Sequence, residues 1–130
     1  MKSSKRNPDR LSEPNGALLA LGITGIFNLW KLSADERGTM LGFTAGDGRL
    51  SAFIRGTPLP ADPKVLDRVG HLTGIYTALQ TLAPHNPEYS AQWMTSRNRA
   101  FQNRTPVEVI AERGLEGLIE LRNYLDAALG

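Results

Sequence analysis

The chain contains no cysteine among its 130 residues. This absence excludes disulfide bonds, thiol catalysis and cysteine-ligated zinc or iron–sulfur sites. It also fits a reducing compartment, so we expect a cytoplasmic location. Only two histidines are present, His71 and His85, and no further ligands accompany them at metal-binding spacing. We therefore expect no metal ion and no other cofactor.

Motifs that carry catalysis are also missing. No serine lies in a nucleophile elbow. Residues 46–51 approach a dinucleotide-binding fingerprint, but they lack its third glycine and do not follow a strand. Glu112, Glu116 and Glu120 recur at every fourth position, a spacing that is usual for a solvated helix face. We expect that the protein is not an enzyme.

No hydrophobic run is long enough to cross a bilayer. The apolar stretch at residues 17–30 is too short, and it follows a leader that contains Asp9, Glu13 and two prolines. No cleavage site of small residues comes after it, so we interpret it as a core helix and expect no membrane partner. The chain also lacks a large excess of charge of either sign: the net charge is +2. So small a basic excess permits contact with nucleic acid but does not require it.

What the chain does contain is a series of helix signals. No window shows the period-two alternation of a strand, so we predict an all-α fold of six or seven helices. The clearest helix covers residues 63–82, with Asp62 as its cap and Pro63 at its start. Its apolar residues form one continuous stripe: Val65, Val69, Leu72, Tyr76 and Leu79.

The first part of the chain predicts three helices. The first covers residues 17–29, and packing must hold it because its glycines lower its helix propensity. Ser33 and Glu36 form a capping box that opens the second helix, which ends near Gly42. The third is expected at residues 44–54.

Another capping box starts a helix in the last third of the chain. Thr105 is the N-cap, Pro106 fits the first helical position and Glu108 stands three residues after the threonine. We assign structural roles to these three residues. The helix ends near Gly114, and a last helix follows with an apolar set of Leu115, Leu118, Ile119, Leu121, Leu125 and Leu129.

Two short helices after a longer one are typical of a helix-turn-helix. In such a unit Arg49, Ser51 and Arg55 would contact DNA. Asp47 would repel phosphate, and a scaffold that has lost its DNA contacts explains the pattern as well; both interpretations stay open. We interpret residues 1–15 as a disordered basic leader, with an arm that touches DNA phosphates as the alternative.

Aromatic residues and arginines gather just before the second capping box. Interfaces favour these residue types. We expect Trp93 and Phe101 to be structural core residues. Arg97, Arg99 and Arg104 have no acidic residue among them, so these unopposed charges are either solvated or bind an acidic partner; both interpretations stay open.

Several motifs of the second half follow a known order and spacing. They are the stretch from Leu72 to Leu79, Trp93 with Asn98 and Phe101, the run from Arg104 to Ile110, Gly114-Leu115, and Tyr124-Leu125-Asp126. On these motifs, residues 63–130 resemble the C-terminal toxin-binding domain of the Xre/MbcA/ParS class of antitoxins. Residues 30–36 with Leu41-Gly42 resemble the front of the same family's Xre-like helix-turn-helix.

The resemblance implies a degenerate Xre-like helix-turn-helix at residues 16–62, followed by a small helical toxin-binding domain at residues 63–130. Many members carry glycines where this chain has Gln102-Asn103. One of these two residues must therefore take any strained backbone angle there, which asparagine tolerates best. The expected recognition-helix pattern is missing between residues 44 and 55, which counts against operator binding.

In function, the resemblance implies an antitoxin with a cognate RES-domain toxin as its partner. Such toxins resemble ADP-ribosyltransferases and consume NAD, and the antitoxin docks over the toxin and blocks its nucleotide cleft. A homodimer within the complex and binding to operator DNA are further implications. The alternative is a helix-turn-helix transcriptional regulator without a toxin partner. On the antitoxin hypothesis we expect the toxin contacts at Arg97, Asn98, Arg99, Arg104, Arg122, Tyr124 and Leu125.

Overall fold

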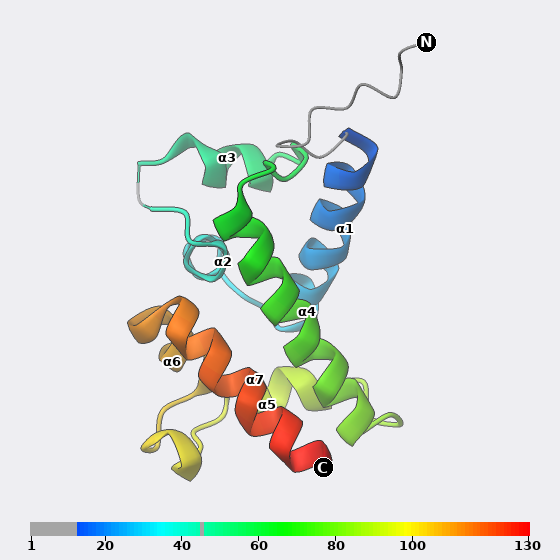
Figure 1. The fold of residues 1–130 in the computed structure, drawn as a ribbon, viewed down its shortest axis with the longest axis vertical. Helices are drawn as coiled ribbons and strands as arrows, with labels where there is room; N and C mark the ends of the chain where they lie inside the picture. Colours follow the sequence, from blue (N-terminus) through cyan, green and yellow to red (C-terminus); the bar gives the residue numbers. More distant parts are fainter. Residues whose placement is uncertain (1–12, 45) are drawn as a thin grey trace.

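The structure is a computed structural model that describes residues 13–44 and 46–130. Over these residues the chain forms seven α-helices, one short 3-10 helix and no strand, which confirms the predicted all-α fold. The elements are α1 (Glu13–Leu29), α2 (Ala34–Leu41), α3 (Gly48–Ile54), α4 (Pro63–Leu82), α5 (Tyr89–Thr95), η1 (Arg99–Phe101), α6 (Pro106–Arg113) and α7 (Leu115–Leu129). In Figure 1, α4 runs through the middle, with α1, α2 and α3 around its first half and α5, α6 and α7 around its second half. None of the described helices is both long and apolar enough to span a membrane.

Both capping boxes form as predicted. The backbone N–H of Glu36 donates to the Ser33 hydroxyl at 3.1 Å, and the Ser33 N–H donates to the Glu36 carboxylate at 2.8 Å. In the Thr105–Glu108 box the matching distances are 3.0 and 2.9 Å. These contacts satisfy backbone N–H groups that the first turn of a helix leaves unpaired. The starts of α2 and α6 therefore follow from local sequence alone.

Two helices start elsewhere than the sequence predicts. α1 begins at Glu13, so the end of the expected leader is helical, while residues 1–12 lie outside the described part of the chain. α3 begins at Gly48 rather than near residue 44, because Asp47 is its N-cap. Gly46 has a φ of 82°, a left-handed angle that cannot continue a right-handed helix.

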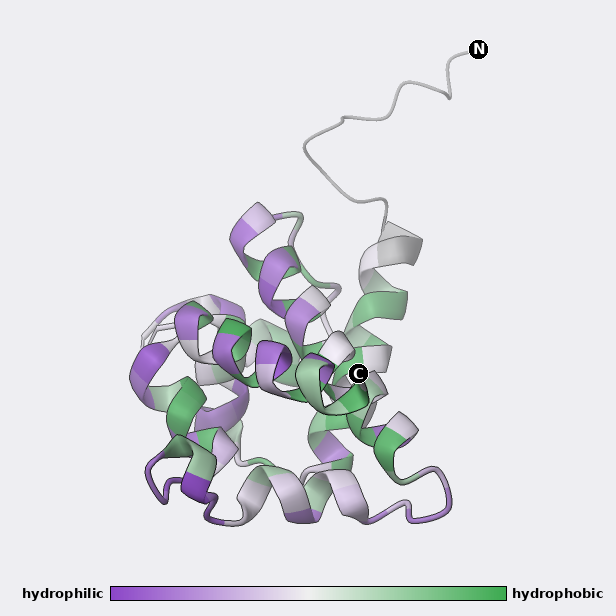
Figure 2. Ribbon diagram, turned by 60° about the horizontal axis from the view of Figure 1, so that its bottom comes forward, coloured by the Kyte–Doolittle hydropathy of each residue, from purple (hydrophilic) through white to green (hydrophobic). Residues whose placement is uncertain are grey.

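One hydrophobic core takes residues from every helix. The predicted stripe of α4 lies in it, with only Tyr76 half-buried at its edge. α4 packs against α1 and α2 as well as against α5 and α7, so the expected boundary at residue 63 is the start of a helix that both halves share. Figure 2 shows hydrophobic and hydrophilic residues mixed along α7, whereas α1 is green or pale over most of its described length.

A buried hydrogen bond joins the end of α1 to α5. The indole N–H of Trp30 donates to the Ser90 hydroxyl at 3.2 Å, and both residues are fully buried, at 0% exposure. Replacing Ser90 by alanine leaves this N–H without a partner in the core. We expect Ser90→Ala to lower the free energy of unfolding by about 1–2 kcal/mol, measured by urea denaturation. Thr95→Ala is the control, because the Thr95 hydroxyl only bonds Ala91 within the same helix; an equal loss in both variants would contradict the prediction.

Arg68 of α4 donates a hydrogen bond to the C-terminal end of α2, a role that we did not predict from the sequence. Gly42 ends α2 with a φ of 81°, which confirms the predicted C-cap. The Arg68 guanidinium donates to the Thr39 carbonyl at 3.2 Å and lies so close to Gly42 that an added Cβ there would be 2.8 Å from its Nε. A cation at these carbonyls complements the negative end of the helix dipole. Arg68 thus fixes α2 to α4.

Candidate functional site

Three aromatic side chains meet where α5, η1 and α7 come together, and we call them the aromatic cluster. The Tyr124 ring stacks on Trp93 with centroids 6.3 Å apart and meets Phe101 at 5.1 Å; Trp93 and Phe101 meet edge-on at 6.1 Å. Phe101 is buried and Trp93 is half-buried, whereas Tyr124 is 42% exposed. The cluster therefore presents one large ring at the surface and holds it in place with two others.

Residues 97–104 form a hairpin that carries Phe101 into the aromatic cluster. The backbone N–H of Asn98 donates to the Arg104 carbonyl at 3.0 Å, and the Asn98 side chain accepts from the Ala100 N–H at 2.9 Å to cap η1. The chain then turns through Gln102 and Asn103, whose φ angles are 59° and 65°. Both residues adopt the left-handed conformation, where the sequence led us to expect only one.

The left-handed angle at Gln102 predicts a stabilising substitution. A side chain in this conformation costs about 1–2 kcal/mol, a cost that glycine does not carry. Because glycine also gains freedom in the unfolded chain, we expect Gln102→Gly to raise the free energy of unfolding by about 0.5–1 kcal/mol. Chemical denaturation measures the change. Gln102→Ala, which keeps a Cβ at the same angle, should show no such gain; a gain in both variants would refute the explanation.

Two of the three hairpin arginines are paired within the chain. Arg104 forms an ion pair with Glu112 at 2.7 Å, and Arg97 lies 4.0 Å from Glu108. α6 brings both acids back beside the hairpin, so the expectation of unopposed charges is wrong for these two arginines. Arg99 is exposed at the start of η1, where an acidic partner can reach it.

The candidate residues on α7 do not share one side of the helix. Arg122 and Tyr124 lie about 200° apart around the axis, and only Tyr124 joins the aromatic cluster. Arg122 lies against α4: its guanidinium donates to the Gly70 carbonyl at 3.4 Å, and a Cβ added at Gly74 would come within 2.6 Å of it. Leu125 is 1% exposed and belongs to the core. Its side chain offers no surface to a toxin, which corrects the expectation of a contact there.

The acidic residues spaced by four do not form one helix face. Gly114 separates α6 from α7, so Glu112 lies on one helix and the other two on the next. Arg113 reaches Glu116 at 3.8 Å and Glu120 at 3.5 Å. The acids of this region therefore serve as ion-pair partners for arginines rather than as a separate solvated stripe.

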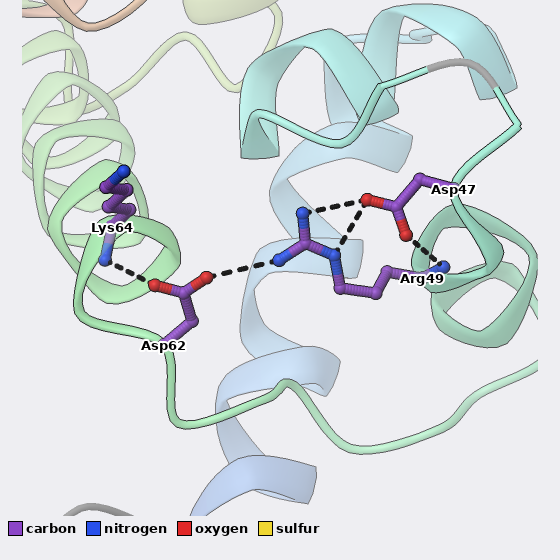
Figure 3. A network of polar contacts seen from close by, with 4 residues as sticks. All are labelled: Asp47, Arg49, Asp62 and Lys64. Atoms are coloured by element: carbon purple, nitrogen blue, oxygen red, sulfur yellow. Dashed lines mark hydrogen bonds and ion pairs between the residues drawn. The ribbon is translucent and has the colours of Figure 1, made fainter.

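Arg49 at the start of α3 is held by carboxylates on two sides (Figure 3). Its guanidinium pairs with Asp47 at 2.8 Å and with Asp62 at 3.2 Å, and it lies over the Phe43 ring at 4.7 Å from the centroid. Hydrogen bonds from the Arg49 side chain and backbone lower the pKa of the Asp47 carboxyl. Asp62 also caps α4 through the Lys64 N–H at 2.9 Å, so this network ties the start of α3 to the start of α4.

The ion pairs of Arg49 reduce the number of residues that can contact DNA. Ser51 on α3 and Arg55, the C-cap of this helix, are exposed, but Arg49 would have to leave two carboxylates to reach a phosphate. α3 is also only seven residues long. Among the described residues, α3 and its C-cap therefore offer only Ser51 and Arg55 to DNA, less than the sequence led us to expect.

The aromatic cluster, the hairpin and α7 all lie in the part of the chain that resembles a known protein family. Residues 78–130 match the family model described as the antitoxin Xre/MbcA/ParS C-terminal toxin-binding domain. This part of the chain is similar to that family's domain. The match confirms the resemblance that its motifs indicate. A search among curated proteins found no match for the chain.

The matched region spans the end of α4 and all of α5, η1, α6 and α7. Every residue proposed as a toxin contact lies inside it, and the residues proposed for DNA contact lie outside it. The match starts at Ala78 and covers less than half of the chain. Residues 78–130 are thus similar to the toxin-binding domain of antitoxins.

Proposed function

We propose that this protein is an antitoxin that neutralises a RES-type, NAD-consuming toxin in the cytoplasm by binding it and occluding its active-site cleft. The observation that carries the proposal is the family match of residues 78–130. The exposed ring of Tyr124, which the same domain presents, supports a contact surface there. Inhibition by occlusion requires no catalysis, in keeping with our expectation that the protein is not an enzyme.

The aromatic cluster together with Arg99 has the chemistry of a binding surface. Tyrosine, tryptophan and arginine are the residues most enriched among binding hot spots. The Tyr124 ring already rests on Trp93 and Phe101, so binding has little side-chain freedom to remove from it. The same residues therefore combine a large contact area with a small entropic cost.

The charges of the hairpin indicate where on the toxin it binds. A cleft that binds the phosphates of NAD is itself basic, so Arg99 would be repelled from its floor. We expect Arg99 to contact acidic residues on the rim of the cleft. Arg97 and Arg104 keep the hairpin in shape through their ion pairs with α6, and Arg122 supports α7 from the side of α4.

Co-expression with the toxin encoded next to this protein tests the proposal. NAD levels are measured in cells that make the toxin alone and in cells that make both proteins. We expect the antitoxin to preserve NAD, and the purified proteins to form a complex in which the toxin no longer hydrolyses NAD. Loss of NAD while both proteins accumulate would refute occlusion.

A homodimer within the toxin complex is part of the proposal, and the mass of the purified complex tests it. Autorepression through operator DNA finds less support. A regulator without a toxin, the alternative, predicts operator binding that falls steeply with salt and depends on Arg49 and Arg55. The pairing of Arg49 with two carboxylates counts against that alternative.

A further inference from the structure

A small pocket lies where the hairpin, α6 and α7 meet. Its volume is about 90 Å³, enough for several water molecules or for the end of one long side chain. Phe101 and Val109 form apolar parts of its wall, and Glu120 is the acidic residue that lines it. Phe101 also belongs to the aromatic cluster, and Glu120 precedes Tyr124 by one turn on the same side of α7. The pocket therefore adjoins the surface that we propose for toxin binding.

One oxygen of the Glu120 carboxylate lacks a hydrogen-bond donor. This oxygen, Oε1, is buried, and none of the described residues donates a hydrogen bond to it. Nη1 of Arg113 lies 3.5 Å away, so it attracts the oxygen without forming a hydrogen bond. A buried acceptor in this state costs free energy until a donor binds it. Because the Glu120 side chain as a whole is 38% exposed, a donor from outside the chain can reach the carboxylate.

The ion pairs around the pocket leave an excess of negative charge. Arg104 pairs with Glu112 at 2.7 Å, and these two charges balance. Arg113 is shared between Glu116 and Glu120, at 3.8 and 3.5 Å. One arginine cannot neutralise two carboxylates, and Glu120 is the one of the two that lines the pocket. The charge at the pocket therefore favours a cationic donor.

We propose that this pocket receives a basic side chain of the toxin, a lysine or an arginine, whose charged end binds the Glu120 carboxylate. The apolar wall of the pocket suits the aliphatic stem of such a side chain. A cleft for the phosphates of NAD carries basic residues, so the toxin has these side chains close to the surface that the antitoxin covers. The inference rests on the proposed function. It adds that Tyr124 supplies contact area, whereas Glu120 selects a toxin with a cation at the matching position.

Replacing Glu120 by glutamine tests the contact, because it keeps the shape of the side chain and removes its charge. The measurement is calorimetric titration of the full chain with the purified toxin encoded next to it. We expect Glu120→Gln to bind about 30-fold more weakly, since loss of one partner of a desolvated charge pair is costly. Thermal unfolding of the free variant should match that of the unmodified protein. An unchanged Kd would overturn the inference.

Glu116→Gln is the matched control. It removes a carboxylate from the same Arg113, but Glu116 is 82% exposed and does not line the pocket. Such an exposed pair contributes little, so we expect the Kd of this variant to stay within about threefold of the unmodified value. Equal losses of affinity in the two variants would show that the total charge of α7 matters rather than the pocket, which also overturns the inference.

A double-mutant cycle separates direct contact from support of the fold. The basic residues at the toxin's cleft are replaced singly by methionine, and each toxin variant is titrated with the unmodified antitoxin and with Glu120→Gln. We expect one replacement to weaken binding of the unmodified antitoxin by about tenfold or more and to have little further effect on Glu120→Gln. Additive losses at every basic residue would overturn the inference and leave the proposed function intact. A toxin that does not bind the unmodified protein would overturn both.

Discussion

Replacing Tyr124 by alanine is expected to weaken toxin binding by about 30-fold or more, because loss of a hot-spot side chain costs about 2 kcal/mol or more. The ring is 42% exposed and rests on Trp93 and Phe101. It is therefore placed to enter a pocket of the partner without rearranging. Calorimetric titration of purified toxin gives the change in Kd, and cellular NAD on co-expression gives its functional consequence.

Ile119→Ala is the matched control for Tyr124→Ala. Ile119 lies on the same helix and is 38% exposed, but it is about 140° around the axis from Tyr124. We expect its substitution to leave the Kd within a few-fold of the unmodified value. Thermal unfolding of both variants separates a loss of binding from a loss of fold. Equal losses of affinity at the two positions would show that the aromatic cluster is not the contact surface.

The helices that were predicted correctly are those that local sequence signals mark. A capping box involves residues three positions apart, so Ser33-Glu36 and Thr105-Glu108 predict their helix starts without knowledge of the rest of the chain. The long helix at residues 63–82 is predicted equally well, because a proline start and a regular apolar stripe agree. The start of α3 was not predicted correctly: the helix was expected from residue 44, but it begins at Gly48 after the Asp47 cap, because the left-handed Gly46 rules out an earlier start.

The candidate site depended on contacts that local sequence does not specify. Arg97 and Arg104 have no acid beside them in the sequence, yet α6 returns Glu108 and Glu112 to them. Such pairings follow from the direction of the chain after the hairpin, which only the tertiary structure shows. The aromatic residues were found from composition, but their stacking with Tyr124, about 30 positions after Trp93, was not.

Arg122 illustrates a signal that the sequence did carry. Gly70 and Gly74 are four residues apart on α4, so they lie on one side of the helix. A glycine pair in a long helix indicates close approach of another group. At Gly74 that group is the Arg122 guanidinium from α7, which lies 2.6 Å from an added Cβ, whereas at Gly70 the guanidinium reaches only the carbonyl oxygen, at 3.4 Å. Arg122, which we expect among the toxin contacts, therefore also joins two helices of the fold.

Replacing Gly117 by alanine is expected to lower the free energy of unfolding by about 2 kcal/mol or more. Gly117 is buried where α7 crosses α6, and an added Cβ would lie 2.7 Å from the Val109 carbonyl oxygen and 3.2 Å from the Ile110 Cα. These are backbone atoms of a helix, so they cannot rotate away as a side chain can. The two helices must separate instead, and this loss exceeds the gain of about 1 kcal/mol that alanine brings to a helix interior.

Gly70→Ala is the control with the opposite expected sign. Gly70 is also inside a helix, but among the described residues no atom lies within 4 Å of its added Cβ. Alanine should therefore raise the free energy of unfolding there by about 0.5–1 kcal/mol. Urea denaturation of both variants gives the comparison, and stabilisation by Gly117→Ala would show that α6 and α7 do not approach so closely. Because α6 begins at the Thr105–Glu108 box directly after the hairpin, separation of the helices would also move the hairpin relative to Tyr124. We accordingly expect Gly117→Ala to weaken toxin binding even at temperatures where the variant remains folded.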